Sequence, residues 1–182
     1  MVEELSLQFD ADFLAKYSIV EKIGQGGMGV VYRAKQKELG RTVAVKSLIE
    51  REGGFSAKQL ARFKREAQIL STLRHRNIVS VFDYGVSGCP YLVIEFLQGT
   101  PLDELLKKRN LAVPQVIAII LQLLDGLEHA HSAKILHRDL KPGNIFIQED
   151  YTVKILDFGL AKKDDQSTQL TKTGAALGTA YY

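Results

Sequence analysis

The sequence predicts an α+β chain whose first half is mainly antiparallel sheet and whose second half is mainly helical. β-branched and aromatic residues alternate with polar ones between residues 17 and 46. A stripe of apolar residues at helical spacing follows Ser56, and a nearly continuous apolar run follows Pro114. The Gly-Thr-Pro break at residues 99–101 lies close to the boundary between these parts. We therefore expect an N-terminal extension (1–16), a first lobe (17–96) and a partial second lobe (97–182).

Composition places the chain among globular proteins. Of its 182 residues 46% are hydrophobic and 25% charged, which argues against a disordered tail or a biased repeat. The net charge of +3 is small, and the basic clusters at 107–109 and 162–163 are short. Such scattered charge forms a solvated surface, so we expect no nucleic-acid partner.

The cysteine count and the length of the apolar runs indicate in which cellular compartment the chain is expected. Cys89 is the single cysteine, so the chain forms no internal disulfide, as is usual in a reducing compartment. Cys89 stands beside Pro90 in an expected turn. The acidic start lacks the apolar core of a secretory signal, and the stretch 116–124 is too short to span a bilayer. We expect a cytoplasmic protein with no membrane segment in these residues; an anchor beyond residue 182 stays possible.

Strand patterns fill most of the first half. Residues 17–23, 30–35 and 42–46 read as strands, and glycine-bearing segments separate them, which predicts an antiparallel meander. Two more strand-like runs occur at 78–82 and 91–95.

A helix is expected to begin at Ser56, because Ser56 and Gln59 have the spacing of a capping box. Its apolar stripe then recurs at three- and four-residue intervals. The stripe comprises Leu60, Phe63, Ala67 and Leu70.

The second half opens with a long helix. Pro114 suits its first turn, and the pattern continues to about residue 131. The helix is apolar nearly all round, so we expect it to be buried on most sides. Short strands are expected at 144–147 and 153–156, and a polar loop at 164–173. The main stripe of the helix is Val116, Ile120, Leu123, Leu127 and Ala130.

Residues 24–29 read Gly-Gln-Gly-Gly-Met-Gly, and three functional interpretations compete. A dinucleotide-binding turn opens a helix, whereas Val30-Val31-Tyr32 here is strand-like. A Walker A loop needs Lys-Ser/Thr after the last glycine, where Val30 stands. A glycine-rich hairpin over nucleotide phosphates, with Val31 against the base, fits better. A merely flexible turn stays open beside it.

Two charged residues stand among apolar neighbours. Lys46 ends a Val-Ala-Val-Lys strand, and Glu66 lies near the apolar stripe of the helix that begins at Ser56. A carboxylate is costly to bury unless it is paired. The two are therefore hypothesised to meet and to leave the ammonium directed at phosphate oxygens, although an exposed lysine is the commoner arrangement on strands.

The densest chemistry lies in residues 137–144, His-Arg-Asp-Leu-Lys-Pro-Gly-Asn, followed by Asp-Phe-Gly at 157–159. Asp139 is a candidate base for a hydroxyl proton. Asn144 and Asp157 offer the oxygen ligands that Mg²⁺ prefers. Lys141 has the charge to neutralise a moving phosphoryl group.

In this order the motifs resemble those of eukaryotic-type (Hanks-type) serine/threonine protein kinases. A lysine at the position of Lys141 resembles the serine/threonine branch of the family. The sequence of residues 24–34 resembles that of bacterial members. The resemblance runs from about Tyr17 to the last residue. It implies a bilobal protein-kinase-like fold that transfers the γ-phosphoryl of ATP, with Mg²⁺, to Ser/Thr hydroxyls of proteins. We also expect autophosphorylation or self-association, the latter favoured by the apolar helix 114–131.

The resemblance also assigns roles to residues. It implies catalysis by Asp139 and Lys141 together with Lys46 and Glu66, and metal binding by Asn144 and Asp157. Ile94 backs the adenine pocket, and Leu70, Val81, His137 and Phe158 stack into a spine. The implied nucleotide-binding residues are Gly24, Gln25, Gly26, Gly27, Met28, Gly29, Val31, Ala44, Lys46, Glu95, Leu97 and Phe146.

Regulation follows from the same resemblance. Arg138 corresponds to an arginine that receives a phosphate from the activation loop, and Thr171 and Thr173 are the candidate acceptors. Thr179 is interpreted as structural support for the catalytic loop. No metal or catalytic role is expected for the histidines outside these motifs, which are His75, His129 and His131.

Family members continue past the position of Tyr182 with an Ala/Ser-Pro-Glu anchor and several helices. We therefore expect a kinase truncated within its activation segment, in which one side of the helix 114–131 faces water or another chain. The alternative is a nucleotide-binding or regulatory module without phosphotransfer of its own.

Overall fold

The computed structural model describes residues 9–26, 29–48, 54–108 and 110–158, without the side chains of Lys58, Arg62 and Glu66. The chain divides into two compact units. The first holds residues 1–74 and 79–97, and the second holds residues 75–78 and 98–182. Each unit is described by itself.

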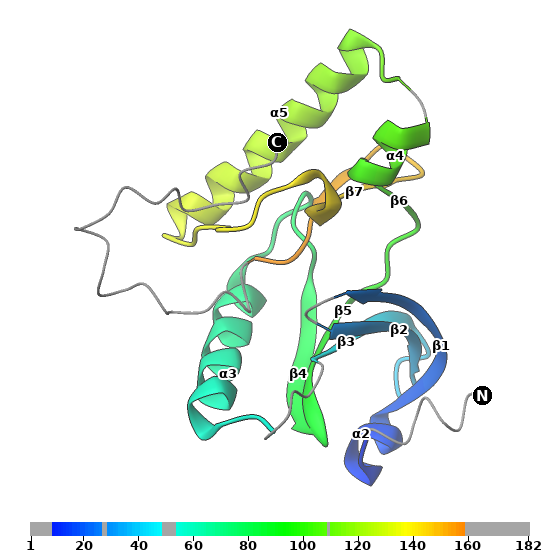
Figure 1. Cartoon of the computed structure of the whole chain (residues 1–182), viewed down its shortest axis with the longest axis vertical. Helices are drawn as coiled ribbons and strands as arrows, with labels where there is room; N and C mark the ends of the chain where they lie inside the picture. The colour runs from blue at the N-terminus through cyan, green and yellow to red at the C-terminus, as the bar shows by residue number, and fades with distance from the viewer. Residues whose placement is uncertain (1–8, 27–28, 49–53, 109, 159–182) are drawn as a thin grey trace. The chain divides into compact units, whose positions relative to one another are not determined.

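The first unit is built on a five-stranded antiparallel sheet in the order β1-β2-β3-β5-β4 (Figure 1). β1, β2 and β3 form the meander that the sequence predicted, each slightly longer than its pattern. The strands are β1 (Tyr17–Gly26), β2 (Gly29–Gln36), β3 (Thr42–Leu48), β4 (Val81–Ser87) and β5 (Cys89–Glu95).

The β4–β5 hairpin differs from its prediction. β4 begins at Val81, and Ile78 instead forms an isolated parallel bridge with Ile155 in the second unit. The expected turn at Cys89 is wrong, since Cys89 and Pro90 are buried in β5. The reversal falls at Gly88, whose φ of 65° supplies the left-handed conformation that a tight turn requires.

Helix α3 (Ala57–Thr72) lies along β4 in Figure 1. Its capping box is confirmed, because Ser56 Oγ accepts from the Gln59 N–H at 3.3 Å and Gln59 Oε1 accepts from the Ser56 N–H at 2.8 Å. Phe63, Ala67 and Leu70 of the predicted stripe are buried.

A short helix ahead of the sheet completes the core of the first unit. α2 (Ala11–Lys16) is capped by Asp10, whose Oδ1 accepts from the Phe13 N–H at 2.9 Å. Phe9 stacks on Phe13 at 4.1 Å between ring centroids, and Phe13 meets Tyr91 edge-on at 4.8 Å. Residues that the sequence placed in an N-terminal extension therefore contribute aromatic side chains to the sheet core.

The second unit joins a small antiparallel sheet to helices. Its strands are ordered β6-β7-β8, and a 3-10 turn, η1 (Pro142–Asn144), leads directly into β7. The sequence analysis predicted neither β6 nor α4, although α4 has acidic residues in its first turn and basic residues in its last. The other elements are β6 (Gly99–Pro101), α4 (Leu102–Lys108), α5 (Val113–Ser132), β7 (Ile145–Gln148) and β8 (Val153–Ile155).

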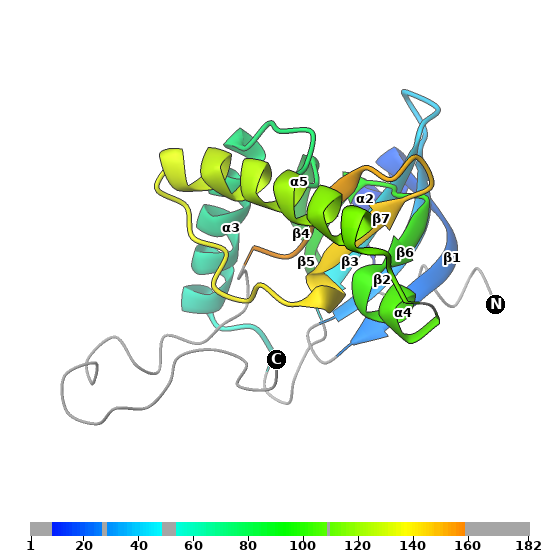
Figure 2. The ribbon, with the colours of Figure 1, turned by 90° about the horizontal axis from the view of Figure 1, so that it is seen from above.

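Helix α5 is the longest element of this unit (Figure 2). Pro114 lies in its first turn as predicted, and Ile119 and Leu123 pack on the β7–β8 core. Burial on most sides is wrong, and Val116 and Ile120 of the predicted main stripe are themselves exposed. One side of the helix is exposed, as expected, and it comprises Val113, Val116, Ile117, Ile120, Leu121 and Leu124. None of the described helices combines the length and apolar character needed to cross a membrane.

The Phe9–Phe13 stack predicts a measurable stability contribution. Phe13→Ala removes a ring that is 1% exposed, so the free energy of unfolding of the first unit should fall by about 3–5 kcal/mol. Amide hydrogen exchange of β1–β5 measures that change. Leu39→Ala, at a side chain 62% exposed, is the control and should change it by less than about 0.5 kcal/mol. Equal effects of the two substitutions would contradict a core role for α2.

Candidate active site

The loop between α5 and β7 gathers polar groups around Asp139. Lys141 Nζ lies 3.1 Å from Asp139 Oδ2. Asn144 Nδ2 donates to the Asp139 carbonyl oxygen at 2.8 Å and to its Oδ2 at 3.2 Å. Asp139 is buried at 9% exposure. Three of the four predicted groups of this motif set are thus brought together within one unit.

The backbone links this loop to Asp157, the fourth group. The Asn144 N–H donates to the Lys141 carbonyl oxygen at 2.9 Å within η1, and the Leu156 N–H donates to the Asn144 carbonyl oxygen at 2.8 Å. Asp157 therefore follows directly on a residue hydrogen-bonded to Asn144. Asp157 (φ 49°) and Arg138 (φ 63°) both occupy the left-handed region. Such conformations are costly for residues other than glycine and occur preferentially at functional sites.

His137 anchors both ends of the arrangement. Its Nε2–H donates to the Leu156 carbonyl oxygen at 2.7 Å, and its Nδ1 accepts from the Asp139 N–H at 3.3 Å. The centroid of its ring lies 4.6 Å from that of the Phe158 ring. His137 and Phe158 are two of the four residues that were expected to stack into a spine. Burial lowers the pKa of His137 below 6.5 and outweighs the Leu156 hydrogen bond and the nearby carboxylates, which raise it. The neutral ring thus acts as a fixed support.

The glycine motif forms the β1–β2 hairpin of the first unit. Gly26 pairs with Gly29, and Gly24 pairs with Val31. A strand, not a helix, follows the last glycine, which is incompatible with the dinucleotide-binding turn. Gly27 and Met28 lie outside the described residues, and Gln25, opposite Val30, is exposed.

The glycines of this hairpin differ in what surrounds them. A Cβ at Gly29 would stand 2.3 Å from the Ser47 carbonyl oxygen, so β2 and β3 approach too closely for any side chain there. A Cβ at Gly26 would meet nothing within 4 Å. Gly29 is therefore required by the sheet, whereas Gly26 is not.

The remaining nucleotide-site candidates of the first unit lie on neighbouring strands. Val31 pairs with Lys46, and Ala44 pairs with Ile94. The Glu95 N–H donates to the Ser80 carbonyl oxygen at 3.0 Å, and Glu95 Oε1 accepts from the Ser80 N–H at 2.7 Å. Half-buried Leu97 ends the unit.

Some predicted residues are not brought together by the described structure. Lys46 is half-buried on β3, and Glu66 lies in α3 without a described side chain, so their pairing stays a prediction. Phe146 lies on β7 in the second unit. The candidate phosphorylation sites Thr171 and Thr173, and Thr179 with them, lie outside the described residues.

Two histidines form a cluster that the sequence did not indicate. The rings of His75 and His129 stack at 5.0 Å, and His75 Nε2 lies 3.4 Å from Asp125 Oδ2. The four-residue spacing of Asp125 and His129 on α5 was the available signal, but their meeting with His75 depends on tertiary packing. Within the described ranges, no three His, Cys, Asp or Glu residues are placed to hold a metal ion.

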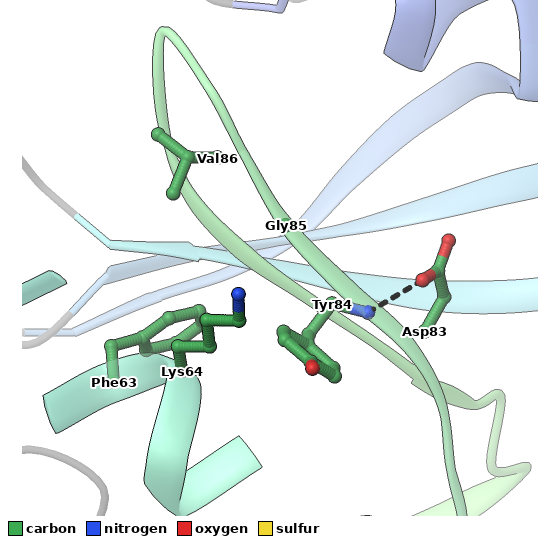
Figure 3. Close-up of a pocket in the computed structure, with 6 residues that line it drawn as sticks. All are labelled: Phe63, Lys64, Asp83, Tyr84, Gly85 and Val86. Carbon is green, nitrogen blue, oxygen red and sulfur yellow. Dashed lines mark hydrogen bonds between the residues drawn. The ribbon is translucent and has the colours of Figure 1, made fainter. Parts of the chain in front are cut away.

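A hollow of about 450 Å³ lies between α3 and β4 (Figure 3). Asp83 at its edge accepts from the Tyr17 hydroxyl at 2.9 Å and from the Tyr84 N–H at 2.8 Å. Burial, with the Asp83 carboxylate beside it, raises the pKa of Tyr17. The sequence gave no signal for the hollow, which is lined by Phe63, Lys64, Asp83, Tyr84, Gly85 and Val86.

Comparison with known proteins agrees with this geometry. The protein kinase domain family matches residues 17–182. Over 170 residues the chain is 41% identical to the serine/threonine-protein kinase PknL of Mycobacterium tuberculosis, covering 92% of this chain and 42% of PknL. Over 177 residues it is 39% identical to a "probable serine/threonine-protein kinase" of Streptomyces coelicolor, covering 92% of this chain and 26% of that protein.

Among solved structures, the PknI kinase domain of Mycobacterium tuberculosis aligns with a TM-score of 0.72 and 27% identity. The alignment covers 81% of this chain and 61% of that domain. The chain therefore belongs to the protein kinase family and has its α+β fold, with the antiparallel sheet of the N-lobe and a helical part of the C-lobe. It spans less than half the length of the two curated relatives above.

The contrast between the two glycines predicts opposite effects on stability. Gly29→Ala should lower the melting temperature by several degrees, because its Cβ collides with the Ser47 carbonyl. Gly26→Ala is the matched control and should shift it by no more than about one degree, which a thermal melt followed by circular dichroism measures. A larger loss in Gly26→Ala than in Gly29→Ala would contradict the close approach of β2 and β3.

The buried neutral ring of His137 predicts a pH dependence. As pH falls, the His137 ring of the unfolded chain takes up a proton at a higher pH than the buried ring of the folded chain. The contribution of the neutral ring to the free energy of unfolding is therefore complete above about pH 6.5 and is lost as pH falls toward the lowered pKa. A proton NMR titration of the ring should give a midpoint below 6.5. A midpoint at or above 6.5 would contradict the burial argument.

Proposed function

We propose that this chain is the nucleotide-binding and catalytic part of an ATP-dependent protein serine/threonine kinase. The observation that carries the proposal is the placement of Lys141 and Asn144 on Asp139, with Asp157 following a residue bonded to Asn144. The same groups in the same order are those expected for phosphoryl transfer. The named relatives support the serine/threonine class.

The donor set fits Mg²⁺. Asn144 uses its amide nitrogen for Asp139, so its amide oxygen is the group left for a cation, and Asp157 supplies a carboxylate. Mg²⁺ prefers such oxygen ligands and commonly takes only one or two from protein, with substrate phosphates supplying others. When bound, the ion would neutralise charge on the phosphates.

The chain's own residues would position the reactants. Asp139 accepts a hydrogen bond from the substrate hydroxyl and orients its oxygen for in-line attack. Lys141, already 3.1 Å from Asp139, stabilises charge on the transferred group. His137 and Asn144 hold the Asp139 backbone and side chain, so little reorganisation is needed. The loop therefore acts through position and electrostatics.

Nucleotide binding is proposed for the first lobe, residues 17–96. The hairpin 24–29 would cover the phosphates, and Lys46, held by Glu66, would contact them. Val31 and Ala44 of this lobe would contact the adenine, and the backbone of Glu95 and Leu97 would bond its edge. Phe146, on β7 in the second lobe (97–182), is proposed as an adenine contact on the resemblance alone. The open surroundings of Gly26 support close approach of a ligand to this backbone.

Partners and regulation complete the proposal. Serine- or threonine-bearing proteins are the proposed substrates, the cytoplasm is the proposed compartment, and nucleic acid is not a proposed partner. Phosphorylation of Thr171 or Thr173 would order the activation loop through Arg138. The exposed apolar side of α5 favours self-association.

A second candidate is a nucleotide-binding or regulatory module without phosphotransfer. One observation favours it: six large apolar side chains of α5 are exposed.

Intact mass after incubation with Mg²⁺ and ATP separates the two candidates. The wild-type chain should gain phosphate at Thr171 or Thr173, whereas Asp139→Asn and Asp157→Ala should gain at least about 100-fold less, because each removes a group placed at the transferring phosphate. Normal phosphorylation of Asp157→Ala would contradict the site. ATP binding without phosphate gain in all three chains would favour the second candidate.

A further inference from the structure

The turn at residues 75–78 is part of the second unit, although the residues on both sides of it belong to the first. Asn77 connects this turn to β8. Its Nδ2 donates to the Val153 carbonyl oxygen at 2.8 Å, and its carbonyl oxygen accepts from the Ile155 N–H at 2.8 Å. One buried residue therefore holds both ends of β8, the strand that leads to Asp157.

The backbone N–H of Asn77 depends in turn on a histidine. It donates to His75 Nδ1 at 3.1 Å, as in an Asx turn with an imidazole nitrogen in place of the usual side-chain oxygen. A ring nitrogen accepts a hydrogen bond only while it carries no proton, so the neutral ring holds its proton on Nε2. Because Asn77 is 1% exposed, solvent does not readily replace this acceptor.

Two titratable groups of α5 face the same ring. His75 Nε2 lies 3.4 Å from Asp125 Oδ2, and the His75 ring stacks on that of His129 at 5.0 Å. The Asp125 side chain is 59% exposed, so water screens its attraction for a charged ring. His129 opposes that attraction whenever it is itself charged, and the exposed Arg74 and Arg76 add positive charge on either side of His75.

We propose that the hydrogen bond to His75 is a pH-sensitive contact, which holds the 75–78 turn on β8 while the ring is neutral and releases it when the ring is protonated. A proton on Nδ1 would face the Asn77 N–H with a second donor, and the buried N–H would lose its acceptor. An imidazole changes its charge between about pH 8 and pH 5. Since the neutral ring makes the contact, the contact is complete at the alkaline end of that range and is lost toward the acid end.

Amide hydrogen exchange of Asn77 and Ile155 tests this in the whole chain and requires no phosphotransfer. Each exchange rate is divided by that of an unstructured peptide at the same pH, which removes the direct effect of pH on exchange. Between about pH 7.5 and pH 5 the protection of both amides in the wild type should fall about five- to tenfold, as expected for one lost hydrogen bond. The fall should follow the protonation of His75, read from the NMR signals of its ring.

His75→Asn is the decisive variant. An asparagine oxygen takes the place of Nδ1, accepts from the Asn77 N–H in the same type of turn and takes up no proton. His129→Gln is the matched control, because it removes the other ring of the pair and leaves Nδ1 in place. Loss of stability through His137 is common to all these chains, so they are compared with one another at each pH.

At about pH 5 the two amides should stay protected about five- to tenfold better in His75→Asn than in the wild type, and His129→Gln should behave as the wild type does. Equal protection of the wild type and His75→Asn across the range would overturn the proposal. An Asn77 amide signal in the wild type that does not move as the His75 ring is protonated would overturn it as well, whether or not the variant folds.

Discussion

The hydrogen bonds from Asn144 to Asp139 are the contact on which the rest of the site depends. One amide nitrogen holds both the carbonyl and the carboxylate of Asp139, and the Asn144 carbonyl accepts the backbone N–H that precedes Asp157. The candidate base and the candidate metal ligands are thereby fixed by a single residue, which η1 and β7 position in turn.

Rigid surroundings explain why so short a loop keeps its geometry. Asp157 and Arg138 hold left-handed conformations that an isolated chain would avoid. His137 offsets that cost, since it bonds Leu156 on one side and the Asp139 backbone on the other and stacks near Phe158. Because its ring is buried and neutral, it adds no competing charge beside the carboxylates. Catalysis by position needs this kind of pre-organised support.

Local signals were enough to predict the three-strand meander, the capped helix at Ser56 and the grouping of polar residues around Asp139, because each depends on residues close in sequence. Contacts between residues far apart in the sequence could not be predicted from such local signals. Phe9 and Phe13 gain their role only when they meet Tyr91, and α4 brings Asp103 to Gly143 from 40 positions away. The exposed side of α5 shows the converse, since an apolar pattern predicts burial only where a covering element is present.

Ion-dependent line broadening in NMR spectra tests the central claim most directly. Mn²⁺, a paramagnetic substitute for Mg²⁺, would be titrated into the chain with and without ATP. The account predicts that the amide signals of Asn144 and Asp157 broaden, and far more strongly when ATP is present. Broadening that ignores ATP, or that spares Asn144 and Asp157, would contradict a nucleotide-metal site organised by the Asp139 loop.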